Sequence, residues 1–278
     1  MASKKEFDFK QEHFEKVRDM VTEHAGIVLT DAKQDMIYSR LVRRIRKTKT
    51  GDFDGYLAYL DDPANDEFTE FINSITTNLT SFFRENHHFE LLKDKVLPEL
   101  MERNKDSRKL RIWSAGCSTG METYSIAMVI KEVIPDNAGW DVKILATDLD
   151  TNVLQTASDG VYEVERITGV SDQRFNTWFM QGEGDNATKA KVSKKLRSLV
   201  TFKQLNLLQP FPMSGSMDII FCRNVIIYFD KETQAVLFEK FANTQNINSY
   251  MFIGHSETLY NVTNKYKLHK NTMYQRIQ

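Results

Sequence analysis

The spacing of apolar residues differs between the first part of the chain and the rest. From residue 6 to about residue 85 they recur at helical intervals, as at Phe14, Val17 and Val21, without a dense strand pattern. Beyond that point, short apolar runs alternate with helical stretches, which is typical of a mainly parallel sheet with crossover helices. The pattern predicts a helical N-terminal domain over residues 1–85 and an α/β domain over residues 86–278.

Within the first domain, a helix over about 32–48 is expected to have two different faces, and a further helix is expected over 56–71. Ile37, Leu41 and Ile45 are spaced one turn apart and should face the core. The opposite face is basic and carries Arg40, Arg43, Arg44 and Lys47. Two interpretations of this face stay open. Charge runs usually face solvent, whereas guanidinium groups also match the carboxylates of an acidic partner.

The second domain is organised around a strand, a tight turn and a helix. The apolar run at 110–113 suits a buried strand, and the small residues 114–120 suit the turn. Helical spacing resumes at Tyr124. Gly116 and Gly120 let the backbone approach a ligand closely, and the start of the helix offers unpaired N–H groups. This arrangement predicts the first crossover of a nucleotide-binding α/β sheet.

Two other interpretations of the same turn stay open. Residues 116–120 fit the G-x-S-x-G nucleophile elbow of serine hydrolases, with Ser118, Asp218 and His255 in the right chain order. Against this, Asp218 starts a predicted strand instead of following one. The turn also fits a purely structural role, because a glycine motif alone is weak evidence for a ligand.

Polar residues follow two of the later predicted strands. Asp148 ends the strand expected over 142–146 and suits the binding of ribose hydroxyls, with a helix N-cap as the alternative. For Asp150 the N-cap interpretation is favoured. The strand over 217–222 is followed by residues 223–229, at the edge where open α/β sheets bind ligands.

Residues 160–205 differ in character from the rest of this domain. A turn cluster at 182–186 lies between two segments rich in aromatic and β-branched residues, 175–180 and 199–202. A small antiparallel β insertion is therefore expected over about 160–205.

The segment between the two domains carries unusual side chains. Arg84 follows two phenylalanines and lies among amide and hydroxyl groups, although a hinge with packed phenylalanines is the alternative. The paired His87 and His88 suggest a metal site, but we find neither a carboxylate nor a cysteine at ligand spacing. No metal site is therefore expected.

Composition narrows the class of protein further. The formal net charge of −1 over 278 residues favours neither nucleic acid nor a membrane surface as partner. No apolar run reaches the roughly 18 residues that a membrane-spanning helix needs. The first ten residues lack the apolar core of a signal peptide. Cys117 and Cys222 do not suggest a disulfide framework and fit a reducing compartment. A cytoplasmic protein without membrane insertion is expected.

Five segments, taken in order, carry a recognisable set of motifs. They are NLTSFFRENHHFE (78–90), IWSAGCSTGMETYSIAM (112–128), ATDLD (146–150), FCRNVIIYFD (221–230) and FIGHSE (252–257). Together they resemble the CheR family of chemotaxis-receptor glutamate O-methyltransferases over nearly the full length. The resemblance implies a Rossmann-like S-adenosylmethionine-dependent methyltransferase domain with a small antiparallel β insertion, preceded by an all-α domain. It also implies methyl transfer to glutamate side chains of chemoreceptor signalling helices, with S-adenosylhomocysteine as the product.

The resemblance further implies roles for individual residues. Arg84 and Tyr228 would lie nearest the transferred methyl group. The donor would be bound by Asn78, Thr80, Arg84, Gly116, Glu122, Asp148, Asn206, Leu207, Arg223 and Asn224. The receptor's acidic helices would face Arg40, Arg43, Arg44 and Arg46. In some members the β insertion binds a peptide at the receptor's C-terminus. The chain is expected to act as a monomer and without nucleic acid.

The glycine turn departs from the family pattern at two positions. The family reads G-E-E-P-Y where this chain has Gly120-Met121-Glu122-Thr123-Tyr124. The carboxylate of Glu122 is retained. Met121 lacks the neighbouring carboxylate, and Thr123 replaces a proline that favours a helix start. A non-catalytic binding module stays open as an alternative on account of Met121.

The implied chemistry needs no strong base, because glutamate is already a carboxylate at neutral pH. The donor sulfonium is cationic and the acceptor is anionic, so positioning and exclusion of water should supply most of the rate. Arg84 would orient the acceptor carboxylate. Tyr228 would present either its ring face to the sulfonium or its hydroxyl to the acceptor.

Overall fold

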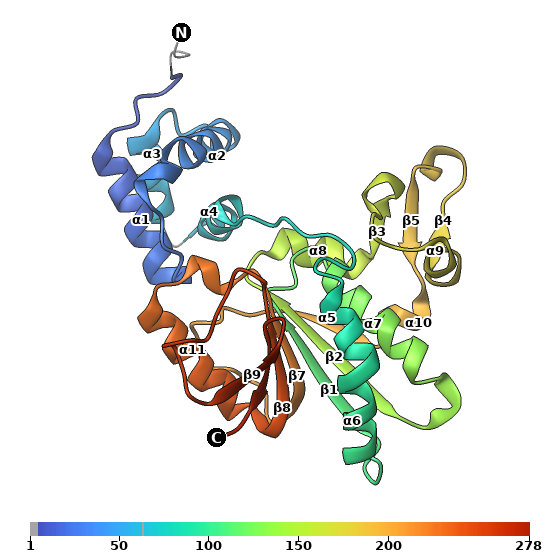
Figure 1. Cartoon of the computed structure of the whole chain (residues 1–278). Coiled ribbons are helices and arrows are strands. Elements are labelled where there is room, and N and C mark those ends of the chain that lie inside the picture. The colour runs from blue at the N-terminus through green and yellow to red at the C-terminus, as the bar shows by residue number, and fades with distance from the viewer. Residues whose placement is uncertain (1–4, 63) are drawn as a thin grey trace. The chain divides into compact units, whose positions relative to one another are not determined.

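The computed structural model describes residues 5–62 and 64–278 (Figure 1). The chain divides into two compact units, one made of the described part of Met1–Thr77 with Tyr228–Asp230 and the other of Asn78–Ile227 with Lys231–Gln278. The sequence pattern places this boundary later, at residue 85. Residues 78–85 belong to the second unit because Phe82 packs edge-on against Tyr162 there, with ring centroids 5.3 Å apart.

The first unit is helical. Its helices are α1 (Gln11–Ala25), α2 (Gln34–Thr48), α3 (Phe53–Leu60) and α4 (Glu67–Ile75). The single helix expected over 56–71 is wrong, because α3 ends at Leu60 and α4 begins at Glu67. Between them the side chains of Asp62 and Asn65 accept backbone N–H groups of Ala64 and Glu67. Such local side-chain bonds compete with helical hydrogen bonds and favour turns. As expected, Ile37, Leu41 and Ile45 are buried.

The second unit is built on a seven-stranded sheet with the order β6-β2-β1-β7-β8-β10-β9. Its strands are β1 (Lys109–Ala115), β2 (Asp141–Asp148), β6 (Val200–Gln204), β7 (Met217–Cys222), β8 (Gln245–Ile253), β9 (Tyr266–Lys270) and β10 (Met273–Arg276). The first five strands in this order are parallel, and β9 and β10 form an antiparallel hairpin. The predicted α/β class with a mainly parallel sheet is confirmed.

Helices cover both faces of this sheet (Figure 1). They are α5 (His87–Leu91), which continues through a π-helical turn (Leu92–Val96) into α6 (Leu97–Arg103), then α7 (Met121–Val133), α8 (Thr151–Asp159) and α11 (Lys231–Asn243). Alternate residues of β1 point to opposite faces. Ile112 joins an apolar cluster that includes residues of α6 and α7. Its neighbour Trp113 instead packs edge-on against Phe241 of α11, with ring centroids 5.2 Å apart.

A second, three-stranded antiparallel sheet forms the insertion. It has the order β3-β5-β4, with β3 (Val161–Glu163), β4 (Phe179–Gln181) and β5 (Lys189–Val192), and is accompanied by the short helices α9 (Asp172–Trp178) and α10 (Lys194–Arg197). The expected antiparallel insertion is therefore present. Its expected far edge is wrong, because residues 200–204 form β6 and pair in parallel with β2 in the main sheet. The physical reason is burial: the Phe202 ring packs against Tyr124 in the main core.

The parallel order brings the carboxyl ends of five strands to one edge of the sheet. The segments that leave this edge are 116–120 after β1, 149–150 after β2, 205–207 after β6, 223–225 after β7 and 254–257 after β8. Among the described residues, none of the helices has the length and apolar character required to span a membrane.

Candidate active site

The glycine turn after β1 is fixed by the neighbouring strand. The backbone N–H groups of Gly116 and Cys117 both donate to the carbonyl of Thr147, at 2.8 and 2.9 Å. Gly116 has φ +79°, and a Cβ atom built on it would lie 2.4 Å from a methyl group of Val225. Only glycine fits there. Ser118 also has a positive φ, 48°, so this turn is strained as well as close to its neighbours.

Asp148 stands at the end of β2 and faces this turn. Its carboxylate accepts the N–H of Ser118 at 2.7 Å and the N–H of Asp150 at 3.0 Å. Burial raises the pKa of Asp148 to about 6, against the opposing effect of these hydrogen bonds. The N-cap alternative belongs to Asp150, as expected, because its side chain accepts the N–H groups of Asn152 and Val153 at the start of α8.

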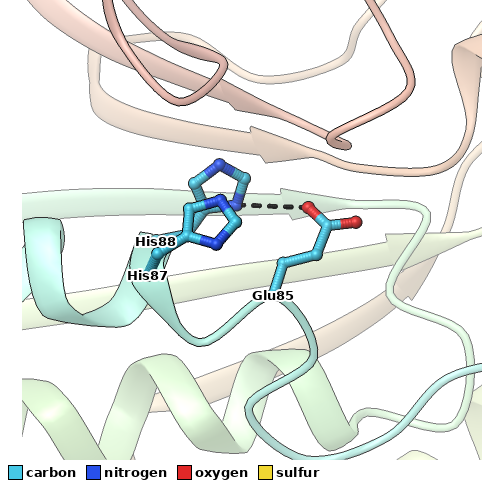
Figure 2. Close-up of side chains that lie close together, drawn as sticks. All are labelled: Glu85, His87 and His88. Carbon is cyan, nitrogen blue, oxygen red and sulfur yellow. Dashed lines mark ion pairs between the residues drawn. The ribbon is translucent and has the colours of Figure 1, made fainter.

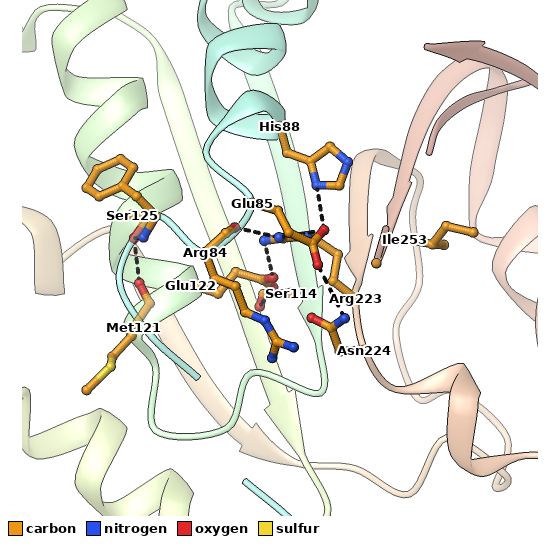
Figure 3. A network of polar contacts seen from close by, with 12 residues as sticks. Arg84, Glu85, His88, Ser114, Met121, Glu122, Ser125, Arg223, Asn224 and Ile253 are labelled. Atoms are coloured by element: carbon orange, nitrogen blue, oxygen red, sulfur yellow. Dashed lines mark hydrogen bonds and ion pairs between the residues drawn. The ribbon is translucent and has the colours of Figure 1, made fainter. Parts of the chain in front are cut away.

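Glu122 lies in the first turn of α7, where the helix dipole favours a negative charge. It accepts a hydrogen bond from the Ser114 hydroxyl at 2.9 Å and pairs with Arg223 Nη1 at 3.0 Å (Figure 3). Burial raises the pKa of Glu122, while Arg223 and Ser114 oppose the shift. Glu122 and Asp148 are at the same end of the sheet, because β1 and β2 are parallel and α7 begins just after the carboxyl end of β1. Burial first, and then both carboxylates, raise the pKa of the Cys117 thiol.

Arg223 joins two carboxylates. Its other terminal nitrogen, Nη2, lies 3.0 Å from Glu85 and also donates to the carbonyl of Arg84 (Figure 3). The side chain is 1% exposed, and both terminal nitrogens have protein partners, whereas the buried Nε has none among the described residues. The resemblance predicts that Arg223 closes around the adenosine, whereas in the structure its charged group holds Glu122 and Glu85.

Arg84 itself points away from this network (Figure 3). Its Nη1 donates to the carbonyl of Leu79 at 2.9 Å. Nearby, the side-chain amide of Asn78 donates to Asp150 at 2.7 Å, and the carbonyl of Asn78 accepts from the Ser118 hydroxyl at 3.3 Å. The half-buried Thr80 lies between Asn78 and Arg84 in the chain. The segment 78–84 therefore borders the glycine turn.

The remaining predicted donor residues follow strands at the same edge. Asn206 and Leu207 come after β6, where the N–H of Leu205 donates to the Asp148 carbonyl at 2.9 Å. Asn224 follows β7 and has φ 58°. Its N–H donates to Glu257 at 2.9 Å.

Tyr228 belongs to the helical unit in this structure. Its carbonyl accepts the N–H of Val28 at 2.8 Å, and Lys33 Nζ lies 5.4 Å from the centre of its ring. A catalytic role for Tyr228 stays a prediction.

Two of the four arginines predicted to face a receptor are bound within the helical unit. Arg44 pairs with Glu67 at 2.7 Å and Glu70 at 3.0 Å, and its side chain is 11% exposed. Arg40 donates to the carbonyl of Thr76 at 2.7 Å and to neighbouring carbonyls.

The other two arginines lie at the surface of the same unit. Arg43 is exposed, and Arg46 pairs with Glu6 while remaining 60% exposed. The basic face of α2 is thus partly structural and partly exposed.

Two carboxylates at this end of the sheet were not singled out from the sequence. Glu85 pairs with Arg223, and Glu257 accepts the N–H groups of Gly254, Asn224 and Ile227. Three backbone donors on one carboxylate fix the segments that follow β7 and β8. Both glutamates lie within the motif segments 78–90 and 252–257. The sequence signal that could have identified them is an acidic residue next to Arg84 in the first segment and just beyond a strand in the second.

Glu85, His87 and His88 lie close together, with potential ligand atoms within 4.8 Å of one another (Figure 2). The expectation that no carboxylate accompanies the paired histidines is therefore wrong. The cluster is nevertheless unfavourable for a cation, because Glu85 already pairs with Arg223 and with His255 Nδ1 at 2.8 Å. An added metal ion would meet the guanidinium charge at short range. The absence of a metal site stays a prediction.

The serine hydrolase interpretation fails on geometry. Ser118 follows β1 at the carboxyl edge of the sheet, whereas Asp218 is the second residue of β7 and lies at the opposite edge. There Asp218 accepts the backbone N–H of Arg111 and pairs with Arg103, both at 2.8 Å. A triad needs its members within hydrogen-bond reach of one another.

Comparisons with known proteins agree with this geometry. The CheR methyltransferase SAM-binding domain matches residues 78–275, and the CheR methyltransferase all-alpha domain matches residues 12–76. Chemotaxis protein methyltransferase 2 of Pseudomonas aeruginosa is 42% identical over 97% of this chain and 94% of its own length. The chemotaxis protein methyltransferase of Escherichia coli is 40% identical over 94% of this chain and 90% of its own length.

Proposed function

The chain belongs to the CheR family of S-adenosylmethionine-dependent chemotaxis methyltransferases, and on this premise we propose that it methylates glutamate side chains in the signalling helices of chemoreceptors. The product would be a γ-carboxylate O-methyl ester. The observation that carries the proposal is the guanidinium of Arg84, which donates to the Leu79 carbonyl and is directed away from Glu85 and Glu122 (Figure 3). A cytoplasmic location and a monomeric state stay predictions from the sequence.

The chemistry of the carboxyl edge fits the donor. When bound, S-adenosylmethionine supplies a methyl group on a positively charged sulfonium, and its ribose hydroxyls require an acceptor. The buried Asp148 and the largely buried Glu122, whose side chain is 13% exposed, suit these needs. A carboxylate offers both a negative charge and hydrogen-bond acceptors, which apolar side chains cannot supply. We assign the ribose hydroxyls to Asp148, and the amino-acid end of the donor to the side of Glu122, Asn78 and Thr80.

The adenosine is assigned to segments that border Asp148. Asn206 and Leu207 follow the neighbouring strand, and Asn224 follows β7. Arg223 is assigned a supporting role, because both of its terminal nitrogens are bound to protein groups. It would hold Glu122 in place and not contact the nucleoside.

Arg84 is assigned to the acceptor. In the described chain its guanidinium donates to one backbone carbonyl, which leaves most of its five donors for a carboxylate. A guanidinium orients a carboxylate through paired hydrogen bonds while an oxygen remains free to attack. Its contribution is positioning, because the acceptor needs no deprotonation at neutral pH.

Receptor docking is assigned to the exposed part of the α2 surface. Arg43 and Arg46 are exposed, whereas Arg40 and Arg44 support the helical unit. The insertion offers a second docking site, because β4 is an edge strand of its sheet and carries Met180 at 54% exposure. Extended peptides bind by adding a strand to such an edge. A receptor tail peptide suits this position.

The test measures methyl transfer from labelled donor to a receptor signalling fragment, with the same fragment carrying glutamine at the candidate sites as control. Esters of glutamate release labelled methanol in mild alkali, so acceptor identity is read directly. We expect Arg84→Ala to lower kcat by about 100-fold, the loss typical of a misplaced reactant. Binding of S-adenosylhomocysteine should survive in part.

Arg276→Ala is the matched control, because Arg276 lies in β10 and donates to a carbonyl near the C-terminus. Its turnover should equal that of the wild type. Equal turnover by Arg84→Ala at saturating donor and receptor would remove Arg84 from the proposed mechanism. Label that resists alkali would remove the glutamate ester.

A further inference from the structure

Arg84 lies in a backbone segment with an uncommon conformation. Phe83 and Glu85, on either side of it, have φ angles of 53° and 56°. Residues other than glycine rarely adopt this left-handed region, and they persist there only where surrounding contacts hold them. The contacts around this segment therefore decide where the Arg84 guanidinium points.

The Glu85 carboxylate makes several of these contacts (Figure 3). It accepts the backbone N–H of His255 at 3.1 Å and lies 2.8 Å from Nδ1 of the same residue. Arg223 Nη2 lies 3.0 Å away, and the side-chain amide of Asn224 lies 3.4 Å away. These donors come from the segments that follow β7 and β8. Glu85 therefore ties the Arg84 segment to the ends of two central strands.

Two further bonds hold the backbone itself. The N–H of Phe83 donates to the Ser125 hydroxyl on α7 at 3.0 Å, and the carbonyl of Arg84 accepts from Arg223. The same Arg223 guanidinium reaches Glu122 in the first turn of α7. The segment is thus fixed from both sides, while the Arg84 guanidinium, apart from its bond to the Leu79 carbonyl, keeps donors for a ligand.

We propose that Glu85 is a positioning residue for methyl transfer, which fixes the backbone on both sides of Arg84 and so directs the Arg84 guanidinium toward the acceptor carboxylate. The inference rests on the proposed role of Arg84. Glu85 is unsuited to proton transfer. Burial would raise its pKa, but hydrogen bonding by His255 and pairing with Arg223 together lower it to about 2.

The kinetic test is a double-mutant cycle that combines Glu85→Gln with Arg84→Ala. If Glu85 acts through Arg84, Glu85→Gln lowers kcat in the wild type by about tenfold and has no further effect in the Arg84→Ala background. The dissociation constant of S-adenosylhomocysteine should change by less than about threefold, because the donor residues remain in place. A merely structural role would lower kcat by the same factor in both backgrounds and weaken donor binding as well.

A second readout does not depend on activity. Hydrogen exchange of the amides in residues 81–86, followed by mass spectrometry, should become about tenfold faster in Glu85→Gln. Glu90→Gln is the matched control, since Glu90 is an exposed glutamate on α5 whose carboxylate accepts from Asn86. His255→Ala is the milder variant, because the His255 side chain is 67% exposed and its loss removes one donor from Glu85.

The possible results separate the two proposals. Full turnover by Arg84→Ala overturns the proposed role of Arg84, and with it this inference, whatever Glu85→Gln does. Reduced turnover by Arg84→Ala, combined with unchanged exchange and turnover in Glu85→Gln and His255→Ala, overturns the positioning role alone. Additive losses in the cycle also overturn it. Faster hydrogen exchange in Glu85→Gln, together with a loss of kcat that is absent in the Arg84→Ala background, supports it.

Discussion

Asp148 provides a test of the donor site that needs no receptor. Its carboxylate is 9% exposed and accepts backbone N–H groups from Ser118 and Asp150. Burial nevertheless raises its pKa from 3.8 to about 6. The folded protein therefore keeps a carboxylate that is poorly solvated before any ligand binds. Replacement by asparagine removes the titrating group while keeping its size.

The size of the effect follows from proton linkage. A shift of roughly 2 pK units corresponds to about 3 kcal/mol at about 1.36 kcal/mol per unit. Because the folded-state pKa is raised, the native protein holds an extra proton between pH values near 4 and 6. The contribution of Asp148 to the free energy of unfolding is thus complete below the unfolded-state pKa and is lost as pH rises through about 6.

Binding should show the opposite pH dependence. Ribose hydroxyls donate to the ionised carboxylate, so the donor competes with the proton. At pH 5 about one tenth of Asp148 is ionised. The dissociation constant of S-adenosylhomocysteine should therefore be about tenfold larger at pH 5 than at pH 7.5. Asp148→Asn should bind weakly at both pH values and lose most of this dependence.

Calorimetric titrations at the two pH values measure binding, and urea unfolding of both proteins from pH 4 to pH 7.5 measures stability. Over that range the wild type should lose about 3 kcal/mol relative to Asp148→Asn. Glu122→Gln serves as the control for the other buried carboxylate of the site. Equal pH profiles for wild type and Asp148→Asn, or an unchanged dissociation constant in the variant, would refute the ribose assignment.

Two further predictions concern residues outside the reaction. Arg44→Met should lower the free energy of unfolding in urea by about 3 kcal/mol, because it leaves the buried Glu67 without its cationic partner and with only the Tyr56 hydroxyl as a side-chain donor. Arg43→Met, at an exposed position of α2, should change it by less than about 0.5 kcal/mol. Met121 is 2% exposed and belongs to the apolar core, so Met121→Leu should lower stability by less than about 1.5 kcal/mol. It should leave binding of S-adenosylhomocysteine unchanged by calorimetry, and a tenfold loss would instead place Met121 in the donor site.

The sequence predicts the carboxyl edge of the sheet well, because its signals are local. A buried strand followed by glycines, as at Gly116, or by an acidic residue, as at Asp148, needs no knowledge of distant residues. The N-cap role of Asp150 is local in the same way and is confirmed.

Contacts between distant segments were not predictable in this way. The charge of Arg44 indicates a basic face, but its partner Glu67 lies on another helix, and only the packing of α2 against α4 brings the two together. The insertion shows the same limit. The apolar pattern at 199–202 predicts a strand, yet it carries no information on whether that strand pairs with β2 or with the insertion.

The charges at the carboxyl edge explain which ligand such a sheet accepts. Most nucleotide-binding sheets of this kind direct the first helix N-terminus at a phosphate. Here Glu122 occupies the first turn of α7, so the start of this helix already carries an acidic side chain. With Glu85 and Asp148 nearby and Arg223 as the buried cation, this end of the sheet carries more negative than positive groups. A phosphate would be repelled, whereas a nucleoside with a cationic sulfonium would be attracted. In the proposed mechanism Arg84, which points away from Glu85 and Glu122 (Figure 3), would supply the positive charge that an anionic acceptor requires.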